Sequence, residues 1–217
     1  HHLKYGLVSL KKGKMSSREG DVVEGEWLLD EAKKKILKQF ENIDKKTAEK
    51  IAVGAVKYSF LKVAPASEIS FDFKESISLQ GSSGPYLQYT YARCRSVLEK
   101  AGLKKLRDVE PRLMLDTAIA QPSIKVNREE EQMLRCFYRF PEIVQRAAEE
   151  YAPNLVCNFL YDLAQRFNAF YNKHRILDAK DAKRETREGF RLLLTAAAAQ
   201  IIKNGLYLLG IKAPREM

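Results

Sequence analysis

The sequence predicts a mainly α-helical protein in which a short strand-and-loop region precedes a bundle of helices. Apolar residues recur with the period of about 3.6 of a buried helix face over most of the chain, whereas extended patterns are confined to residues 4–10 and 67–79. Prolines at 85, 141 and 153 stand where helices would begin, because proline fits the first helical position. The 217 residues are enough for one large domain or two small ones.

Two helices and a second extended segment are predicted in the first part of the chain. One helix runs over 25–40 and the next over 46–63, where Pro65 ends it because proline cannot continue a helix. The predicted buried face of the first helix consists of Trp27, Leu28, Ala32, Ile36, Leu37 and Phe40. That of the second consists of Ile51, Ala55, Tyr58 and Ser59. Residues 67–79 alternate apolar and polar side chains and are predicted to be extended and half-buried.

From residue 85 onward every long segment is predicted to be helical. The predicted ranges are 85–101, 127–139, 141–151, 153–171 and 182–209. Asn127 and Glu130 form a capping box at the start of the second of these helices, and Gly210 ends the last. The last two helices carry apolar stripes, which we interpret as bundle core rather than as a cofactor site. The stripes are Val156, Phe159, Leu160, Leu163, Phe167, Phe170 and Tyr171, and then Phe190, Leu193, Leu194, Ala197, Ile201 and Leu208.

The charge balance predicts an anionic partner. The chain has 38 Lys and Arg against 28 Asp and Glu, a net charge of +10. Its lysines are dispersed, as on a folded surface that follows a phosphate backbone. A basic but inert surface is the alternative. No apolar run approaches the ~20 residues needed to span a bilayer, so no membrane contact is predicted.

The three cysteines predict neither a zinc site nor a disulfide framework. Cys94, Cys136 and Cys157 are widely spaced and form no C-x-x-C pair, and His174 is the one histidine beyond the first two residues. A reducing, cytoplasmic compartment fits this pattern. Cys94 and Cys157 are expected at helix-packing positions.

Residues 13–20 form a cationic, hydroxyl-rich loop between two glycines. Glycine lets the backbone turn tightly, and consecutive amides in such a turn can bind an anion. Lys14 and Arg18 add positive charge, and Ser16 and Ser17 add hydrogen-bond donors and acceptors. This chemistry suits a polyphosphate, while an inert surface turn of the same composition is the alternative.

The string Lys14-Met15-Ser16-Ser17-Arg18, with Tyr5-Gly6-Leu7-Val8 before it, resembles the KMSKS signature loop of class I aminoacyl-tRNA synthetases in its arginyl-tRNA synthetase form. The resemblance implies that residues 14–17 bind ATP and that Lys14, Ser16, Ser17 and Arg18 stabilise the leaving pyrophosphate. Ser17 stands where the general motif has its second lysine. The cation that stabilises the pyrophosphate is therefore Lys14, Arg18 or a residue outside this chain.

A second cluster lies at the start of the helix predicted over 85–101. Tyr86, Tyr89 and Arg93 recur at i, i+3 and i+7, so they lie near one helix face. Tyrosine rings can stack on unpaired bases, and an arginine beside them can hold a phosphate or a base edge. The alternative is that both tyrosines are half-buried packing residues.

Residues 84–93 resemble the entry helix of the anticodon-binding domain of arginyl-tRNA synthetases, which is of the DALR type. Segments at 141–148, 160–171 and 205–217 are similar to later parts of that domain in the same order, although residues 187–192 do not keep the DALR letters. The resemblance implies that four residues lie at the anticodon loop. They are Tyr86, Tyr89, Arg93 and Met217.

Taken over the whole chain, the resemblance implies the C-terminal part of an arginine–tRNA ligase. Residues 1–75 would be the end of a class I, Rossmann-type catalytic domain with helices that contact the tRNA stem. Residues 76–217 would be an all-α anticodon-binding domain. The implied partners are tRNA(Arg), arginine and ATP with Mg²⁺, in a cytoplasmic monomer without a structural metal. Because the nucleotide-binding fold is missing from the sequence, this chain alone is expected to be inactive.

Two other interpretations stay open. The chain could be a free-standing, non-catalytic tRNA-binding module, or a structural or protein-interaction bundle whose basic surface is incidental. Binding of tRNA that falls steeply with salt would argue against the second, because such a dependence reports the release of counterions from phosphates.

Overall fold

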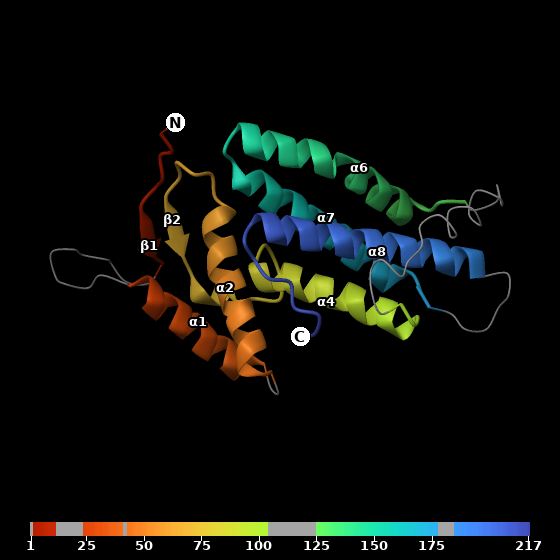
Figure 1. Cartoon of the computed structure of the whole chain (residues 1–217), viewed down its shortest axis with the longest axis horizontal. Coiled ribbons are helices and arrows are strands. Elements are labelled where there is room, and N and C mark those ends of the chain that lie inside the picture. Colours follow the sequence, from red (N-terminus) through yellow and green to blue (C-terminus); the bar gives the residue numbers. More distant parts are fainter. Residues whose placement is uncertain (1, 12–23, 41–42, 104–124, 178–184) are drawn as a thin grey trace.

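The computed structural model describes residues 2–11, 24–40, 43–103, 125–177 and 185–217. Figure 1 shows a small sheet with its helices beside a bundle of long helices. The first group contains β1 (Val8–Leu10), α1 (Gly25–Gln39), α2 (Lys45–Leu61), β2 (Ile69–Phe71) and α3 (Phe73–Ser76). The bundle contains α4 (Gly84–Lys100), α6 (Arg128–Glu149), α7 (Pro153–Lys173) and α8 (Glu185–Leu208). The predicted mainly helical fold is confirmed.

The strands β1 and β2 pair in parallel, with Val8 opposite Ile69 and Leu10 opposite Phe71. The first strand is shorter than the predicted range of 4–10. Helices α1 and α2 pack on each other and on β2 around a small apolar core. Its fully buried members include Ala32, Ile36, Ala48, Ile51 and Ala55.

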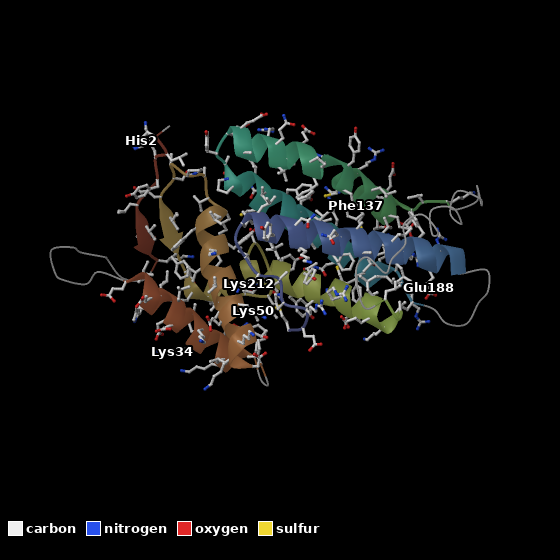
Figure 2. The ribbon with its side chains drawn as sticks, viewed as in Figure 1. His2, Lys34, Lys50, Phe137, Glu188 and Lys212 are labelled. Carbon is white, nitrogen blue, oxygen red and sulfur yellow. The ribbon has the colours of Figure 1, made fainter. Side chains whose placement is uncertain are left out.

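Two residues predicted on the buried face of α1 lie at its edge instead. Trp27 is 45% exposed and Leu37 is 37% exposed, because the apolar stripe of α1 is wider than the surface that α2 covers. Trp27 packs edge-on against Phe73 of α3, with ring centroids 6.0 Å apart. The opposite face carries lysines such as Lys34, which points away from the core (Figure 2).

The segment predicted to be extended over 67–79 is a short strand followed by a helical turn. The carboxylate of Asp72 accepts hydrogen bonds from the amides of Lys74 and Glu75 at 2.7 and 3.2 Å. These are two of the amides that the start of a helix leaves without a partner. The prediction of a continuous extended segment is wrong because capping by Asp72 outweighs the alternating pattern.

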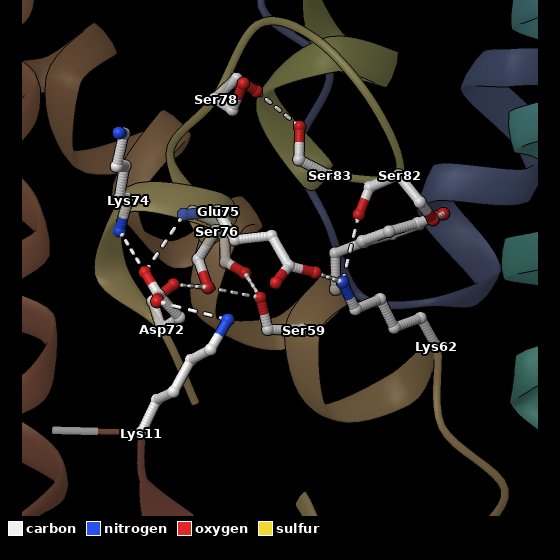
Figure 3. A network of polar contacts seen from close by, with 12 residues as sticks. Lys11, Ser59, Lys62, Asp72, Lys74, Glu75, Ser76, Ser78, Ser82 and Ser83 are labelled. Atoms are coloured by element: carbon white, nitrogen blue, oxygen red, sulfur yellow. Dashed lines mark hydrogen bonds and ion pairs between the residues drawn. The ribbon is translucent and has the colours of Figure 1, made fainter. Parts of the chain in front are cut away.

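A polar network joins this turn to α2 and to the start of α4 (Figure 3). The ammonium of Lys62 donates to Glu75 Oε1 at 2.7 Å and to the carbonyl of Ser82 at 3.2 Å. Ser83 is the N-cap of α4, and its hydroxyl accepts from the amide of Tyr86 at 3.1 Å. The network therefore fixes the first turn of α4, where the predicted tyrosine cluster begins.

Helices α2 and α4 cross at two glycines. A Cβ on Gly84 would lie 2.3 Å from the backbone oxygen of Gly54, so the two backbones are in contact. A Cβ on Gly54 would lie 2.7 Å from the side-chain amide of Gln88. The crossing joins the small N-terminal core to the core of the bundle, to which Tyr58 and Leu87 contribute.

The buried stripe of α7 agrees with the prediction except at its last residue. Of the predicted stripe, Leu160, Leu163, Phe167 and Phe170 are fully buried. Tyr171, predicted as part of this stripe, is 38% exposed. It lies at the edge of the packed surface of α7, where it becomes available to a site.

The buried face of α8 differs from the predicted one. Its buried residues include a row four positions apart, at Leu194, Ala198, Ile202 and Leu206, with Leu192, Thr195, Ala196 and Ala199 beside it. Leu208, which was expected in the core, is 53% exposed. Alanines occupy positions 196–199, and apolar side chains lie on most sides of α8. The spacing of apolar residues in the sequence therefore does not define one buried face. Packing against α4, α6 and α7 defines it instead.

Pro141 lies inside one helix rather than between two. Helix α6 runs from Arg128 to Glu149, and it begins at the predicted capping box, in which Asn127 and Glu130 bond in both directions. Proline removes one intrahelical hydrogen bond. Residues on both sides of it pack against the bundle core, namely Phe137, Phe140 and Ile143. This packing holds the two halves in line, so the prediction of separate helices 127–139 and 141–151 is wrong.

Pro141→Ala should raise the free energy of unfolding by about 2 kcal/mol. Proline inside a helix costs ~3 kcal/mol relative to alanine, of which the lower entropy of the unfolded chain returns up to ~1 kcal/mol. Pro141 is exposed, so its removal loses little packing, while alanine restores an amide that can donate to Phe137. Urea unfolding followed by circular dichroism measures the change, and a lower stability would show that the proline is required by the local packing.

Candidate nucleic-acid interface

A pocket of about 470 Å³ lies where α4, the end of α7 and the C-terminal tail meet. The tail is the non-helical segment 211–217 that follows α8, and Figure 1 shows its end beside α4. Aromatic and cationic side chains form much of the wall. They are Tyr89, Arg93 and Lys100 from α4, Tyr171 from α7 and Arg215 from the tail, with Glu216 and Met217 completing the tail's contribution.

The guanidinium of Arg93 is held by two tyrosines. Its Cζ lies 4.7 Å from the ring centroid of Tyr89 and 4.9 Å from that of Tyr171, within the range of cation–π contact. Arg93 Nη2 donates to the Tyr89 hydroxyl at 3.1 Å, and Nη1 donates to Asn168 Oδ1 at 2.5 Å. The orientation of this planar cation is therefore set by the protein itself.

Asn168 connects the pocket to the packing of α4 against α7. Its Nδ2 donates to the Tyr86 hydroxyl at 3.0 Å and to Thr90 Oγ1 at 3.1 Å, while its Oδ1 accepts from Arg93. The ring of Tyr86 packs edge-on against Tyr161, with centroids 5.8 Å apart. Tyr86 therefore lies in the helix interface behind the pocket and does not line it.

The four residues that the sequence predicts at an RNA surface thus fall into two groups. Tyr89, Arg93 and Met217 line one pocket, although Met217 is at the far end of the sequence from the other two. Tyr86 is joined to them through Asn168. A binding role for each of the four stays a prediction.

The tail reaches the pocket through a turn and a side-chain contact. Gly210 has a φ of 65°, a left-handed conformation that glycine adopts readily. The amides of Gly210 and Ile211 donate back to the last turn of α8, which closes the helix end as predicted. The side chain of Gln88 then donates to the carbonyl of Lys212 at 2.7 Å. Met217 packs against the core formed by α1 and α2.

The chemistry of the pocket suits a flat ring that carries or adjoins negative charge. The lining cations are Arg93, Lys100 and Arg215, against the anions Glu99 and Glu216. Lys100 and Arg215 are exposed to solvent, whereas Arg93 is half-buried among the tyrosines. Aromatic rings beside cations are the usual means of binding an unpaired nucleobase and its phosphate.

Sequence reasoning misses Asn168, Tyr171 and Arg215 as parts of this site. Tyr171 follows Asn168 by three positions, a spacing that puts both on one helix face. That polar residue next to the aromatic stripe is the signal that could have separated Tyr171 from the core. Arg215 lies in a tail without any periodic pattern, so the sequence contains no signal for its position.

The phosphate-loop residues predicted at 13–20 lie outside the described residues. They include Lys14, Met15, Ser16, Ser17 and Arg18. The roles predicted for them therefore rest on the sequence motif alone.

Buried thiols in this fold are unreactive. Cys94 and Cys157 are fully buried at packing positions, as predicted, and burial raises the pKa of Cys157 to about 12. Burial also raises the pKa of Cys136 to about 11, so both thiols stay protonated at neutral pH. Within the described ranges, no three His, Cys, Asp or Glu side chains gather as metal ligands. No helix in the same ranges is long and apolar enough to cross a membrane.

The chain is similar to known proteins over its full length. The model of the DALR anticodon binding domain matches residues 87–217. The chain is 38% identical to an arginine–tRNA ligase of Parabacteroides distasonis and 35% identical to one of Bacteroides thetaiotaomicron, and 100% of it is aligned to each. It covers 36% of each relative, so the chain spans about a third of their length.

Solved structures agree with these relatives. The arginyl-tRNA synthetase of Thermus thermophilus matches 100% of this chain with a TM-score of 0.80 and 32% identity, over 35% of its own length. The arginyl-tRNA synthetase of Plasmodium falciparum matches 98% of the chain with a TM-score of 0.74, over 34% of its own length. At 22% identity the second match shows the fold alone. The predicted resemblance to arginyl-tRNA synthetases is confirmed.

Asn168→Ala should destabilise the fold by about 1–3 kcal/mol, because Tyr86, Thr90 and Arg93 on α4 each lose one hydrogen-bond partner in the helix interface. It should also release Arg93 from its fixed orientation. Urea unfolding measures the first effect, and the near-ultraviolet circular dichroism of the surrounding tyrosines reports the second. Asn172→Ala, an exposed residue one turn further along α7, is the matched control. Equal stability of the two variants would show that the Asn168 contacts contribute nothing.

Proposed function

This chain belongs to the DALR anticodon binding domain family, and from that premise we propose that its pocket binds an unpaired base of a tRNA anticodon loop. The observation that carries the proposal is the guanidinium of Arg93, fixed by Tyr89 and Tyr171 inside the pocket. The net charge of +10 supports a polyanionic partner.

In this proposal the tyrosines and the cations act on different parts of the RNA. The rings of Tyr89 and Tyr171 provide the surface on which a base stacks. Arg93 meets a base edge, because its orientation is set and it is half-buried. Lys100 and Arg215 meet phosphates, because both are exposed at the pocket. Phosphate contacts position the RNA, and base contacts give specificity.

We further propose that the chain acts as the anticodon-binding part of an arginine–tRNA ligase that uses tRNA(Arg), arginine and ATP with Mg²⁺ in the cytoplasm. The similarity to arginine–tRNA ligases over the whole chain supports this. The motif at residues 14–18 supports a role in clamping ATP, since phosphoryl chemistry needs cations and amides placed where charge develops. Residues 1–75 would belong to the catalytic domain and 76–217 to the anticodon-binding domain.

Tyr89→Ala should weaken binding of the tRNA(Arg) anticodon stem-loop by about 1–3 kcal/mol, because one stacking surface is lost. Arg93→Ala should reduce discrimination between anticodons, whereas Arg215→Ala should flatten the salt dependence of binding. Fluorescence anisotropy with labelled stem-loops at several salt concentrations measures all three.

Tyr138→Ala is the control for these variants, because Tyr138 lies on α6, is 89% exposed and does not line the pocket. Its affinity should equal that of the unchanged protein. If the chain is instead a structural or protein-interaction bundle, Tyr89→Ala should lower the melting temperature and leave the affinity of the folded fraction for the stem-loop unaltered. That result would rule out base stacking on Tyr89.

Lys14→Ala, made in an arginine–tRNA ligase that contains this sequence, should slow formation of arginyl-adenylate more than it weakens ATP binding. The leaving pyrophosphate gains charge in the transition state, and loss of one positioned donor there costs ~2.7–4 kcal/mol. Single-turnover kinetics and ATP titration separate the two effects. A normal single-turnover rate of adenylate formation would show that Arg18 or a residue outside the chain, rather than Lys14, stabilises the leaving pyrophosphate.

A further inference from the structure

The C-terminal tail lines the pocket although it has no regular secondary structure. Helix α8 ends at Leu208, and Arg215, Glu216 and Met217 then form part of the pocket wall. Figure 2 labels Lys50 of α2 and Lys212 of the tail close to each other beside α4. The position of the wall therefore depends on what sets the register of the tail against α2 and α4.

One side chain, that of Gln88, contacts both neighbours. Its Nε2 donates one hydrogen bond to the Lys50 carbonyl of α2 at 3.1 Å and the other to the Lys212 carbonyl of the tail at 2.7 Å. A primary amide has two N–H donors, so these bonds use both. The side chain is fully buried against Gly54, where a Cβ would come within 2.7 Å of its nitrogen. Gln88 is thus confined to a single place from which it reaches both carbonyls.

This arrangement is poorly suited to stabilisation alone. Gln88 Oε1 is buried without a hydrogen-bond partner, and this cost offsets much of what the two donated bonds contribute. Lys57 of α2 donates to the Gly210 carbonyl at 2.7 Å and the Ile211 amide donates to the Leu206 carbonyl, so directional bonds fix the start of the tail. Beyond that start, the buried side chains of Ile211 and Pro214 hold the tail by apolar contact. Apolar contact is non-directional, so it does not determine which tail residue lies opposite which. A hydrogen bond to one particular carbonyl of the tail does determine this register.

We propose that Gln88 is a positioning residue, which sets the register of the tail so that Arg215 and Met217 close the pocket. Gln88 does not line the pocket itself, and it acts through the Lys212 carbonyl. The effect on RNA binding rests on the proposed function, whereas the effect on the tail does not.

Gln88→Met in the full 217-residue chain tests the proposal, because it removes both donors and keeps the length and volume of the side chain. The melting temperature should fall only slightly, since removal of the orphan acceptor offsets the loss of a donor at the Lys50 and Lys212 carbonyls. The ¹³C-methyl signal of Met217 should move toward the position of a free methionine. Gln145→Met, an exposed position on α6, is the matched control and should leave that signal unchanged.

Affinity for the anticodon stem-loop should fall about tenfold in Gln88→Met, the change expected for loss of one hydrogen-bonded contact. The same substitution should have little further effect in the full chain that also carries Arg215→Ala and Met217→Ala, because both changes remove the same wall. Such non-additivity distinguishes action through the tail from a general weakening of the fold.

Gly54→Ala provides a second perturbation of the same side chain, and its melting temperature is measured alongside because Gly54 also lies at the crossing of α2 and α4. Its Cβ would displace the unchanged Gln88 amide, because the nearest atoms to that Cβ all belong to Gln88. It should release Met217 in the same way.

If the Met217 signal keeps its position in both variants, the proposal is wrong, whatever the effect of the variants on RNA binding. If the tail is released and the RNA affinity is unchanged, the link between Gln88 and the pocket is overturned. If neither the unchanged protein nor any variant binds the stem-loop, the proposed function is wrong. The Met217 methyl signal then still decides whether Gln88 positions the tail.

Discussion

The contact between the backbones of α2 and α4 at Gly54 and Gly84 is the constraint on which the rest of the structure depends. Because neither residue has a side chain, the helices approach until a Cβ at Gly84 would overlap the Gly54 carbonyl. This approach brings Gln88 within reach of both α2 and the tail. One crossing therefore joins two hydrophobic cores and also determines where one wall of the pocket stands.

Helix α4 can support a binding site because it is fixed on several sides before any ligand is present. Its first turn is capped by Ser83, and its inner face is buried in the bundle through Leu87, Cys94 and Leu98. The outer face then presents Tyr89 and Arg93 to the pocket. A site on a rigid helix, with its side chains held by further contacts, loses little freedom when it binds, so more of each contact's free energy remains as affinity.

Features that depend on neighbouring residues in the sequence could be predicted from it, whereas features that depend on packing between distant segments could not. The capping box at Asn127 and the helix end at Gly210 were predicted correctly, because each depends on a few neighbouring residues. Pro141 and the buried side of α8 were predicted wrongly, because packing against other helices decides both. The site follows the same division. Tyr89 and Arg93 are close in sequence and were found from their helical spacing, but Arg215 reaches them only through the folded tail.

In the proposed RNA site, the two kinds of cation in the pocket would separate affinity from specificity. Exposed cations such as Lys100 can follow a phosphate at many positions, so in the proposed site they would attract RNA without selecting its sequence. Arg93 cannot adapt in this way, because two rings and Asn168 determine its plane. A ligand whose hydrogen-bonding edge does not match that plane must either leave donors unpaired or break existing contacts, and both cost free energy. If the pocket binds RNA as proposed, the rigidity of Arg93, more than its charge, is therefore what would make it selective.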